Sequence, residues 1–254
     1  YADALKSFQQ ALPVLKDPAL VAEAWEKIGD SQFALGQFKE AIPAYQKLTG
    51  SQPEPKNVDR ALFQLGEAFR RIRDVDAATA TFESLVKQYP QSEFAGQAQY
   101  NLGQILVAQG KELEARAAFA AVVEKFPDTQ WARNAALAGG ESFRREGNYD
   151  RAIAEFDKLT GSGLDTELAQ QAFYSHGLCL AATGKREKTL ADFAEFLRSH
   201  PQAPLAPDIA YWIGDEYLRQ KDSLKAQAQF QTLAETYPTN NLADAAQYFA
   251  GRAA

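Results

Sequence analysis

Side chains suited to catalysis or metal binding are scarce in this 254-residue chain. The only histidines are His176 and His200, and the only cysteine is Cys179. His176 and Cys179 stand three residues apart, on one face of a helix, but two ligands are too few for a zinc site. No Ser–His–Asp set, P-loop or dinucleotide fingerprint can be assembled from the spacings. We therefore predict that the protein is not an enzyme and holds no metal and no cofactor.

Arginines form a second set of candidates, because a guanidinium group binds a carboxylate through two parallel hydrogen bonds. Arg70-Arg71 and Arg144-Arg145 are adjacent pairs 74 residues apart, and Arg219 follows Arg145 by the same interval. These side chains are candidates for gripping the acidic groups of a partner.

The alternative is that the arginines pair with carboxylates of their own helix, which is worth a few tenths of a kcal/mol per pair. Carboxylates four residues away offer four such pairs: Glu67–Arg71, Glu141–Arg145, Asp215–Arg219 and Asp74–Arg70. The sequence leaves both interpretations open.

These candidates are positioned by an internal repeat with a period of 37 residues. A glycine recurs at this interval along the chain: Gly29, Gly66, Gly103, Gly140, Gly177, Gly214 and Gly251. Twelve residues later comes an alanine in all but one unit, where Thr189 replaces it. Sixteen residues later comes an aromatic residue in every unit: Tyr45, Phe82, Phe119, Phe156, Phe193 and Phe230. Self-similarity at a fixed period is typical of a repeat array.

Each recurring position has a physical interpretation. Glycine inside a helix costs about 1 kcal/mol relative to alanine, so the first glycine is predicted to mark a close approach of two helices. The alanine and the aromatic residue, four apart, share one face of a second helix. A second glycine is predicted to cap the first helix at Gly36, Gly110, Gly147 and Gly184, with Arg73 and Lys221 in the other units. A proline is expected to end most units: Pro53, Pro90, Pro127, Pro201 and Pro238.

This order of helix A, turn, helix B and proline resembles the tetratricopeptide repeat. The resemblance implies an all-α fold, a right-handed α-solenoid superhelix of about seven helix pairs, forming a single domain over residues 1–254. The usual unit has 34 residues, so three residues are added here. We expect them to lengthen the start of helix A, with N-caps within 90–93, 127–129 and 238–240. Gly139-Gly140 is expected to weaken or bend its helix, and the exit at 160–163, which lacks the proline, to be irregular.

In the tetratricopeptide family, helix A lines the concave face, where peptides or partner helices bind. Helical spacing places the position three before the glycine on the same stripe as the arginines. We expect the partner to contact this stripe, because tyrosine is favoured in protein interfaces. The expected residues are Phe63, Tyr100, Tyr174, Tyr211 and Tyr248 with Arg70, Arg71, Arg144, Arg145 and Arg219. The alternative is that the rings only fill space between successive A helices.

Composition narrows the class of partner. The net charge of −6 and the pI near 5.1 argue against nucleic acid, which needs clustered basic residues. No stretch is long and apolar enough to span a bilayer. The chain begins and ends inside a repeat, so we expect it to be a piece of a longer protein.

The expected function is that of a non-enzymatic scaffold that binds a protein or peptide. The 37-residue unit is similar to repeats of bacterial cell-envelope proteins, such as the Tol–Pal-associated periplasmic protein and the lipoprotein of β-barrel assembly. This similarity favours a periplasmic or envelope-associated location, with the cytoplasm as the alternative. The alternative function is a structural spacer or self-association module within a larger protein.

Overall fold

The computed structural model describes residues 1–52, 54–161, 163–164 and 166–253. Within these residues it contains fourteen α-helices, one short 3-10 helix and no strand. Two residues of the sequence-based predictions lie outside the described residues: Pro53, one of the prolines expected to end a repeat, and Ser162, in the segment 160–163 that was expected to be irregular. The chain divides into two compact units, Tyr1–Ala135 (unit 1) and Ala136–Ala254 (unit 2). The single continuous domain expected from the sequence stays a prediction.

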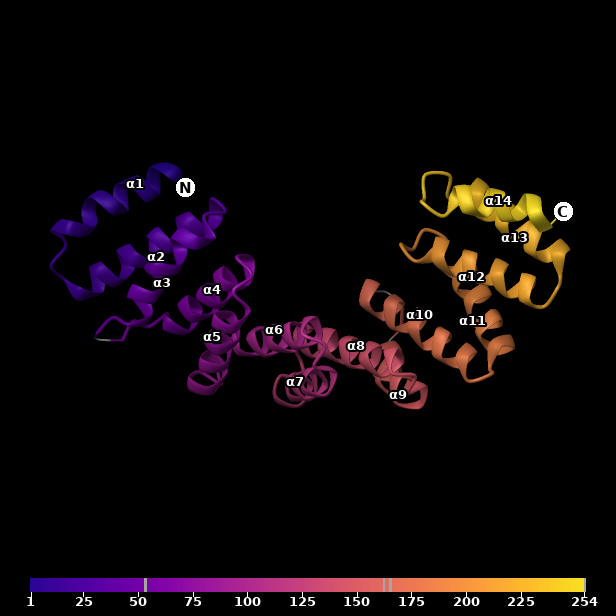
Figure 1. Cartoon of the computed structure of the whole chain (residues 1–254), viewed down its shortest axis with the longest axis horizontal. Helices are drawn as coiled ribbons and strands as arrows, with labels where there is room; N and C mark the ends of the chain where they lie inside the picture. Colours follow the sequence, from indigo (N-terminus) through magenta and orange to yellow (C-terminus); the bar gives the residue numbers. More distant parts are fainter. Residues whose placement is uncertain (53, 162, 165, 254) are drawn as a thin grey trace. The chain divides into compact units, whose positions relative to one another are not determined.

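Unit 1 is built from antiparallel helix pairs joined by short turns (Figure 1). It opens with α1 (Ala2–Ala11) and the 3-10 helix η1 (Leu12–Val14). Three pairs follow: α2 (Pro18–Ala34) with α3 (Phe38–Thr49), α4 (Val58–Arg71) with α5 (Val75–Gln88), and α6 (Ala95–Ala108) with α7 (Glu112–Lys125).

Unit 2 repeats the same plan. Its boundary with unit 1 falls within α8 (Gln130–Arg145), which pairs with α9 (Tyr149–Thr160). The remaining helices are α10 (Glu167–Ala182), α11 (Arg186–Ser199), α12 (Ala206–Arg219), α13 (Ser223–Thr236) and α14 (Ala243–Ala253). The expected all-α repeat fold is confirmed.

The first glycine of each repeat lies beneath an aromatic ring of helix B. A Cβ atom added to Gly103 would stand 2.4 Å from the ring of Phe119, and the other five repeats show gaps of 2.4–2.7 Å. Gly251, the last glycine in this register, has nothing within 4 Å of such an atom. The predicted close approach is therefore confirmed, and the recurring ring is the reason for it.

The second recurring position ends helix A in a left-handed conformation. The four glycines there have φ between 72° and 90°, and the residues that replace glycine, Arg73 and Lys221, have φ of 63° and 59°. In those two repeats the next residue, Asp74 or Asp222, accepts a hydrogen bond of 3.2 Å from the third backbone N–H of helix B. This N-cap offsets part of the strain of a left-handed non-glycine residue.

We had expected the three added residues to lengthen helix A in each repeat, but they do so only in some repeats. Helices α2, α8 and α10 have 17, 16 and 16 residues, but α4, α6 and α12 have 14 each. Before α6 the added residues form a turn, in which Ser92 Oγ accepts a 3.1 Å hydrogen bond from the Phe94 N–H. Before α8 the expected cap forms, because Thr129 Oγ1 accepts from the Ala132 N–H at 3.2 Å. Helix α8 runs unbroken through Gly139-Gly140.

Candidate functional site

The candidate site is the stripe of A-helix residues named from the sequence, which we call the A-helix stripe. Its aromatic members are Phe63, Tyr100, Tyr174, Tyr211 and Tyr248, and its basic members are Arg70, Arg71, Arg144, Arg145 and Arg219. The structure divides them between the two units, with α4 and α6 in unit 1 and the end of α8, α10, α12 and α14 in unit 2.

The rings of the stripe pack against the aromatic residue of their own helix B. The centroid of Tyr100 lies 5.7 Å from that of Phe119, and Tyr174 stacks on Phe193 at 5.7 Å. Tyr211 meets Phe230 at 5.5 Å. Tyr100, Tyr174 and Tyr211 are only half-buried, so each ring covers the core with one side and leaves part of its edge open.

Phe63 does not fit the expected role. It is 7% exposed and packs between Phe82 (6.0 Å) and Phe94 (5.4 Å), because it carries no polar group that must reach water. It is a core residue and does not belong to the open part of the stripe. At the other extreme, Tyr248 is 61% exposed, with the guanidinium of Arg252 5.8 Å from its ring.

In unit 1 the stripe contains a buried carboxylate cluster centred on Glu67, which is 8% exposed. Arg70 donates two hydrogen bonds to it, at 3.0 Å from Nε and 2.6 Å from a terminal nitrogen. Asn101 on the next A helix donates a third at 2.8 Å. The hydrogen bond to Glu67 raises the pKa of Arg70. This Glu67 cluster ties α4 to α6.

In unit 2 the same position holds a looser cluster centred on Glu141. Arg144 donates to it through Nε alone, at 2.8 Å, and the Ser175 hydroxyl on α10 donates a short hydrogen bond to its other oxygen. The hydroxyl of the neighbouring Tyr174 has no hydrogen-bond partner among the described residues. Burial raises the pKa of Tyr174, with the charge of Asp208 adding to this rise and that of Arg144 opposing it.

The ion pairs of the stripe differ from those expected. The acidic partner lies three residues before the arginine in Glu67–Arg70, Glu141–Arg144 and Glu216–Arg219, the last at 3.8 Å. The pairs Glu67–Arg71, Asp215–Arg219 and Asp74–Arg70 do not form.

The two remaining arginines of the stripe have other contacts. Arg71 lies over the ring of Phe38 at 5.5 Å, and Arg145 is engaged within the chain.

One polar network was missed at the level of the sequence. Arg60 on α4 reaches back to α2, where it binds Glu26 at 2.5 Å and Asp30 at 2.9 Å. The Tyr45 hydroxyl donates a hydrogen bond of 2.9 Å to Asp30. Burial raises the pKa of Tyr45, and the charge of Asp30 adds to this rise. The available signal was Tyr45 itself, the one tyrosine in a column of phenylalanines.

The residues first considered for catalysis do not assemble into a reactive site. His176 Nε2 lies 3.2 Å from Asp157 Oδ1, and burial lowers the pKa of His176. Cys179 is fully buried, which raises the pKa of its thiol to about 11. No group of three potential metal ligands occurs among the described residues. None of the described helices combines the length and apolar character that a membrane crossing needs.

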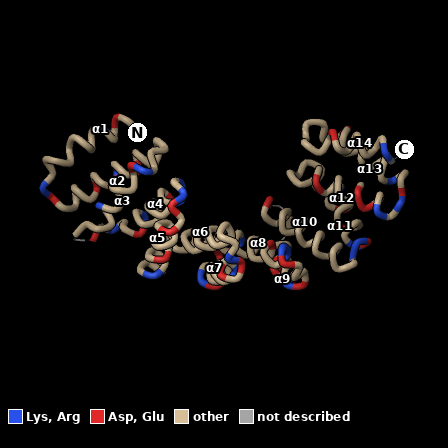
Figure 2. Tube along the Cα trace, viewed as in Figure 1, with Lys and Arg blue, Asp and Glu red and all other residues tan. Residues whose placement is uncertain are grey.

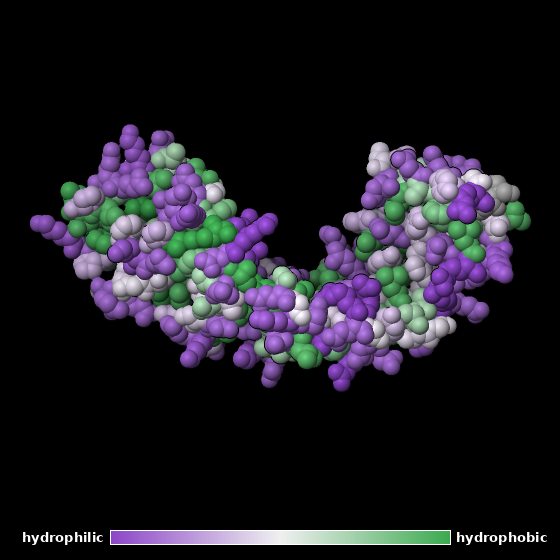
Figure 3. Space-filling view, viewed as in Figure 1, coloured by the Kyte–Doolittle hydropathy of each residue, from purple (hydrophilic) through white to green (hydrophobic). Residues whose placement is uncertain are grey.

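Charges of both signs are interspersed along the helices of each unit (Figure 2). Hydrophilic residues cover much of the visible surface, and hydrophobic residues show in patches among them (Figure 3). This distribution gives no large field of one sign.

Comparison with known proteins agrees with the repeat pattern. The family model of the tetratricopeptide repeat matches residues 1–55, 26–93, 63–129 and 137–204. A search of curated protein sequences gives no match.

Solved structures show the same fold. A tetratricopeptide repeat protein from Parabacteroides merdae matches with 15% identity over 99% of this chain and 91% of its own, at a TM-score of 0.58. The C-terminal part of a repeat protein from Cytophaga hutchinsonii matches with 18% identity, over 83% and 78% of the chains, at 0.64. YrrB, a repeat protein with an unusual peptide-binding site, matches with 22% identity, over 80% and 97%, at 0.56.

Proposed function

Because the chain belongs to the tetratricopeptide-repeat family, we propose that it is a non-enzymatic scaffold that binds a protein or peptide partner through its A-helix stripe. Proteins of this fold are generally interaction scaffolds, and the stacked repeats create extended surfaces for binding. The peptide-binding site of YrrB, a protein of the same fold, supports a peptide as the partner.

The observation that carries this proposal is the unused hydrogen-bonding capacity of unit 2. Arg144 donates a hydrogen bond to Glu141 through Nε only. Its terminal nitrogens have no acceptor among the described residues. The hydroxyls of Tyr174 and Tyr211 are likewise without partners in the part of the chain that the structure describes. A partner that offers a carboxylate and backbone groups would satisfy all of these donors.

The partner-binding set therefore changes from the sequence-based one. Tyr174, Tyr211, Tyr248, Arg144 and Arg219 form the proposed core of the site in unit 2. In unit 1 the proposal keeps Tyr100, Arg70 and Arg71 and drops Phe63, because a 7% exposed side chain cannot contact a partner. Arg145 stays in the proposal as a neighbour of Arg144 at the end of α8.

The test is affinity capture from the native organism with wild-type protein and a double variant, Arg144→Ala with Tyr174→Phe. Both changes keep the rings and the core in place, so we expect unchanged helical content and about a tenfold loss of recovered partner. Arg198→Ala is the matched control, because Arg198 lies on α11, a B helix of unit 2. Equal recovery by the double variant and the control would reject the A-helix stripe as the binding surface.

The proposed setting is a bacterial envelope complex, because the 37-residue unit resembles those of envelope repeat proteins. Fractionation of cells that carry the tagged full-length gene tests this setting. Recovery in the cytoplasmic fraction alone would contradict it.

A structural spacer or self-association module is the second candidate function. It is favoured by exposed apolar side chains on the B helices, Leu113 at 73% and Leu224 at 80% exposed. Sedimentation velocity over a range of concentrations distinguishes the two functions. Association that Leu113→Ser and Leu224→Ser abolish would support self-association, and a strict monomer would exclude it.

A further inference from the structure

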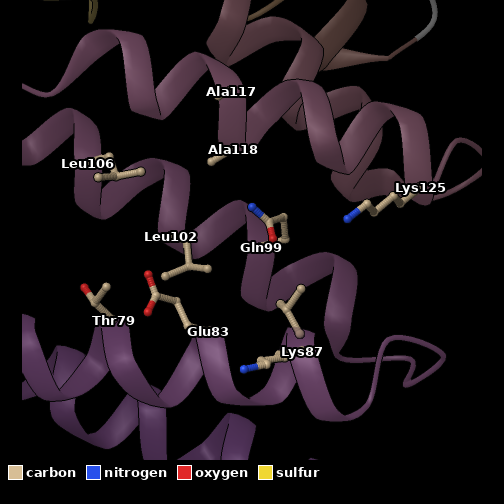
Figure 4. A pocket seen from close by; sticks show the side chains of 10 residues that line it. Thr79, Glu83, Lys87, Gln99, Leu102, Leu106, Ala117, Ala118 and Lys125 are labelled. Atoms are coloured by element: carbon tan, nitrogen blue, oxygen red, sulfur yellow. The ribbon is translucent and has the colours of Figure 1, made fainter.

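A groove of about 640 Å³ runs between the helices α5 and α7 of unit 1, with α6 at its base (Figure 4). Leu102 and Leu106 form the floor, Val86 lies on the α5 side, and Ala117 and Ala118 lie on the α7 side. None of these residues belongs to the A-helix stripe. The groove is therefore a second surface, and what it binds does not depend on the proposed function.

Small side chains at two repeat positions account for the groove. Leu106 stands where three other repeats have the larger rings of Phe69, Phe143 and Tyr217. Ala118 stands where later repeats carry longer polar side chains: Glu155, Asp192 and Gln229. A volume of this size lies within the range of pockets that hold ligands.

One end of the groove is basic. Lys87 on α5 and Lys125 on α7 lie on opposite walls at this end (Figure 4), and neither has an ion-pair partner among the described residues. Glu83, four residues before Lys87, is also unpaired within the described part of the chain. In a protein with a net charge of −6, two lysines without ion-pair partners at one end of the groove form a local site for a negative group.

Between the lysines and the apolar floor lies Gln99, half-buried and without a hydrogen-bond partner within the described residues. Its amide has both donors and an acceptor, which matches the N–H and C=O groups of a peptide backbone. An alkyl chain with a carboxylate head would leave this amide unsatisfied at a cost of about 1–3 kcal/mol.

We propose that the groove between α5 and α7 binds an extended peptide segment that carries two apolar side chains followed by a carboxylate. The apolar side chains lie on Leu102 and Leu106, the backbone pairs with Gln99, and the carboxylate is held between Lys87 and Lys125. The path from Leu106 to Gln99 is seven residues of helix, about 10 Å. Three or four residues of an extended peptide, at about 3.3 Å each, cover that distance.

The test uses fluorescein-labelled pentapeptides in which two positions vary among Leu, Ile, Val and Phe and the last residue is Glu. A matched set ends in a Gln amide. Anisotropy titrations of the full chain should show binding by members of the Glu set that is at least about tenfold tighter than that of their Gln counterparts. Lys87→Glu with Lys125→Glu should abolish this preference, and Glu83→Gln should tighten binding because it removes a negative charge from the groove wall.

Two further variants keep the test falsifiable. Ala117→Trp fills the groove from an exposed wall position and should abolish binding, while Lys47→Glu makes the same type of substitution at one exposed lysine of α3 and should leave binding unchanged. Thermal melts confirm that each variant is folded. Equal binding of the Glu and Gln sets, equal losses in the Lys47 variant, or unchanged binding in the Ala117 variant would each overturn the proposal. Binding of dodecanoate in place of the peptides, or a dimer that Ala117→Trp dissociates, would also overturn it.

Discussion

Residues 66–74 and 140–148 are the same segment of two repeats, and they differ in how firmly their acidic residue is held. Both begin Gly-Glu and continue to Phe-Arg-Arg. The side chain of Glu67 is 10% exposed and accepts three hydrogen bonds, two of them from Arg70. The side chain of Glu141 is 24% exposed, and Arg144 reaches it through Nε only.

The difference comes from the neighbouring helix and not from the motif. In unit 1 the next A helix offers the amide of Asn101, and in unit 2 it offers the shorter hydroxyl of Ser175. The same six-residue pattern therefore makes a closed structural cluster in one unit and leaves a guanidinium with spare donors in the other. A motif fixes which residues can pair, and its neighbours decide whether capacity is left for a partner.

The largest expected effect tests the part that the two segments share. Gly66→Ala and Gly140→Ala each place a Cβ 2.5 Å from a ring carbon of a fully buried phenylalanine, Phe82 or Phe156. Because neither ring has room to move, we expect each change to lower the free energy of unfolding by about 1–3 kcal/mol. Urea denaturation measures this loss.

Gly251→Ala is the control, since its Cβ would meet nothing within 4 Å. It should be neutral or stabilise the chain by up to about 1 kcal/mol through helix propensity. A loss at Gly251 equal to that at Gly66 would show that the ring contact is not the cause.

The next effect separates the two clusters. Glu67→Ala leaves Arg70 and Asn101 without their acceptor, and we expect a loss of about 1–3 kcal/mol of stability. Glu141→Ala should cost less, because Glu141 is more exposed and Arg144 reaches it through one nitrogen only. Chemical denaturation of the two variants side by side checks the order, and a larger loss for Glu141→Ala would break the comparison.

A smaller effect concerns the left-handed residue that ends helix A in each segment. Arg73 and Gly147 occupy equivalent left-handed positions, with φ of 63° and 75°. Arg73→Gly should stabilise unit 1 and Gly147→Ala should destabilise unit 2, each by about 1 kcal/mol. Thermal denaturation detects both shifts, and shifts of the same sign would contradict the cap assignment.

The smallest effect is a pH dependence confined to unit 2, which contains both histidines. Burial lowers the pKa of His176 below its usual value near 6.5, so the unfolded chain binds a proton more readily than the folded chain. The stability from neutral His176 is complete above that value and is lost as the pH falls toward the folded pKa. The protection factors of the α10 amides, which are corrected for the intrinsic slowing of exchange at lower pH, should therefore fall between pH 7 and pH 5.5, and less so in His176→Gln. An equal fall in the protection factors of α4 would point to another group.

The helix pairs and their caps were predictable because each position recurs in several repeats, so an unusual residue in one repeat does not hide the pattern. Even Arg73 and Lys221 were assigned to the cap position, since their place in the period outweighed their poor preference for positive φ. Gly103 was correctly placed at a close helix contact, because glycine in a helix interior needs such a reason.

The candidate site was less predictable because it depends on contacts between repeats. Charge spacing within a helix allows partners three or four residues away, and the two differ too little in energy to choose between them. Asn101 and Arg60 pair with residues 30 or 34 positions earlier, which no pattern within one helix reveals. Phe63 was misplaced for the same reason, since its burial depends on Phe94 at the start of the next helix pair.

The buried thiol of Cys179 has a practical consequence. Alkylating reagents attack the thiolate, and a fully buried thiol with a pKa near 11 supplies almost none at neutral pH. Modification must therefore wait for transient opening of α10, and its rate reports how often that helix exposes its inner face. With a single cysteine in the sequence, the chain carries its own site-specific chemical reporter of local breathing, without any engineered label.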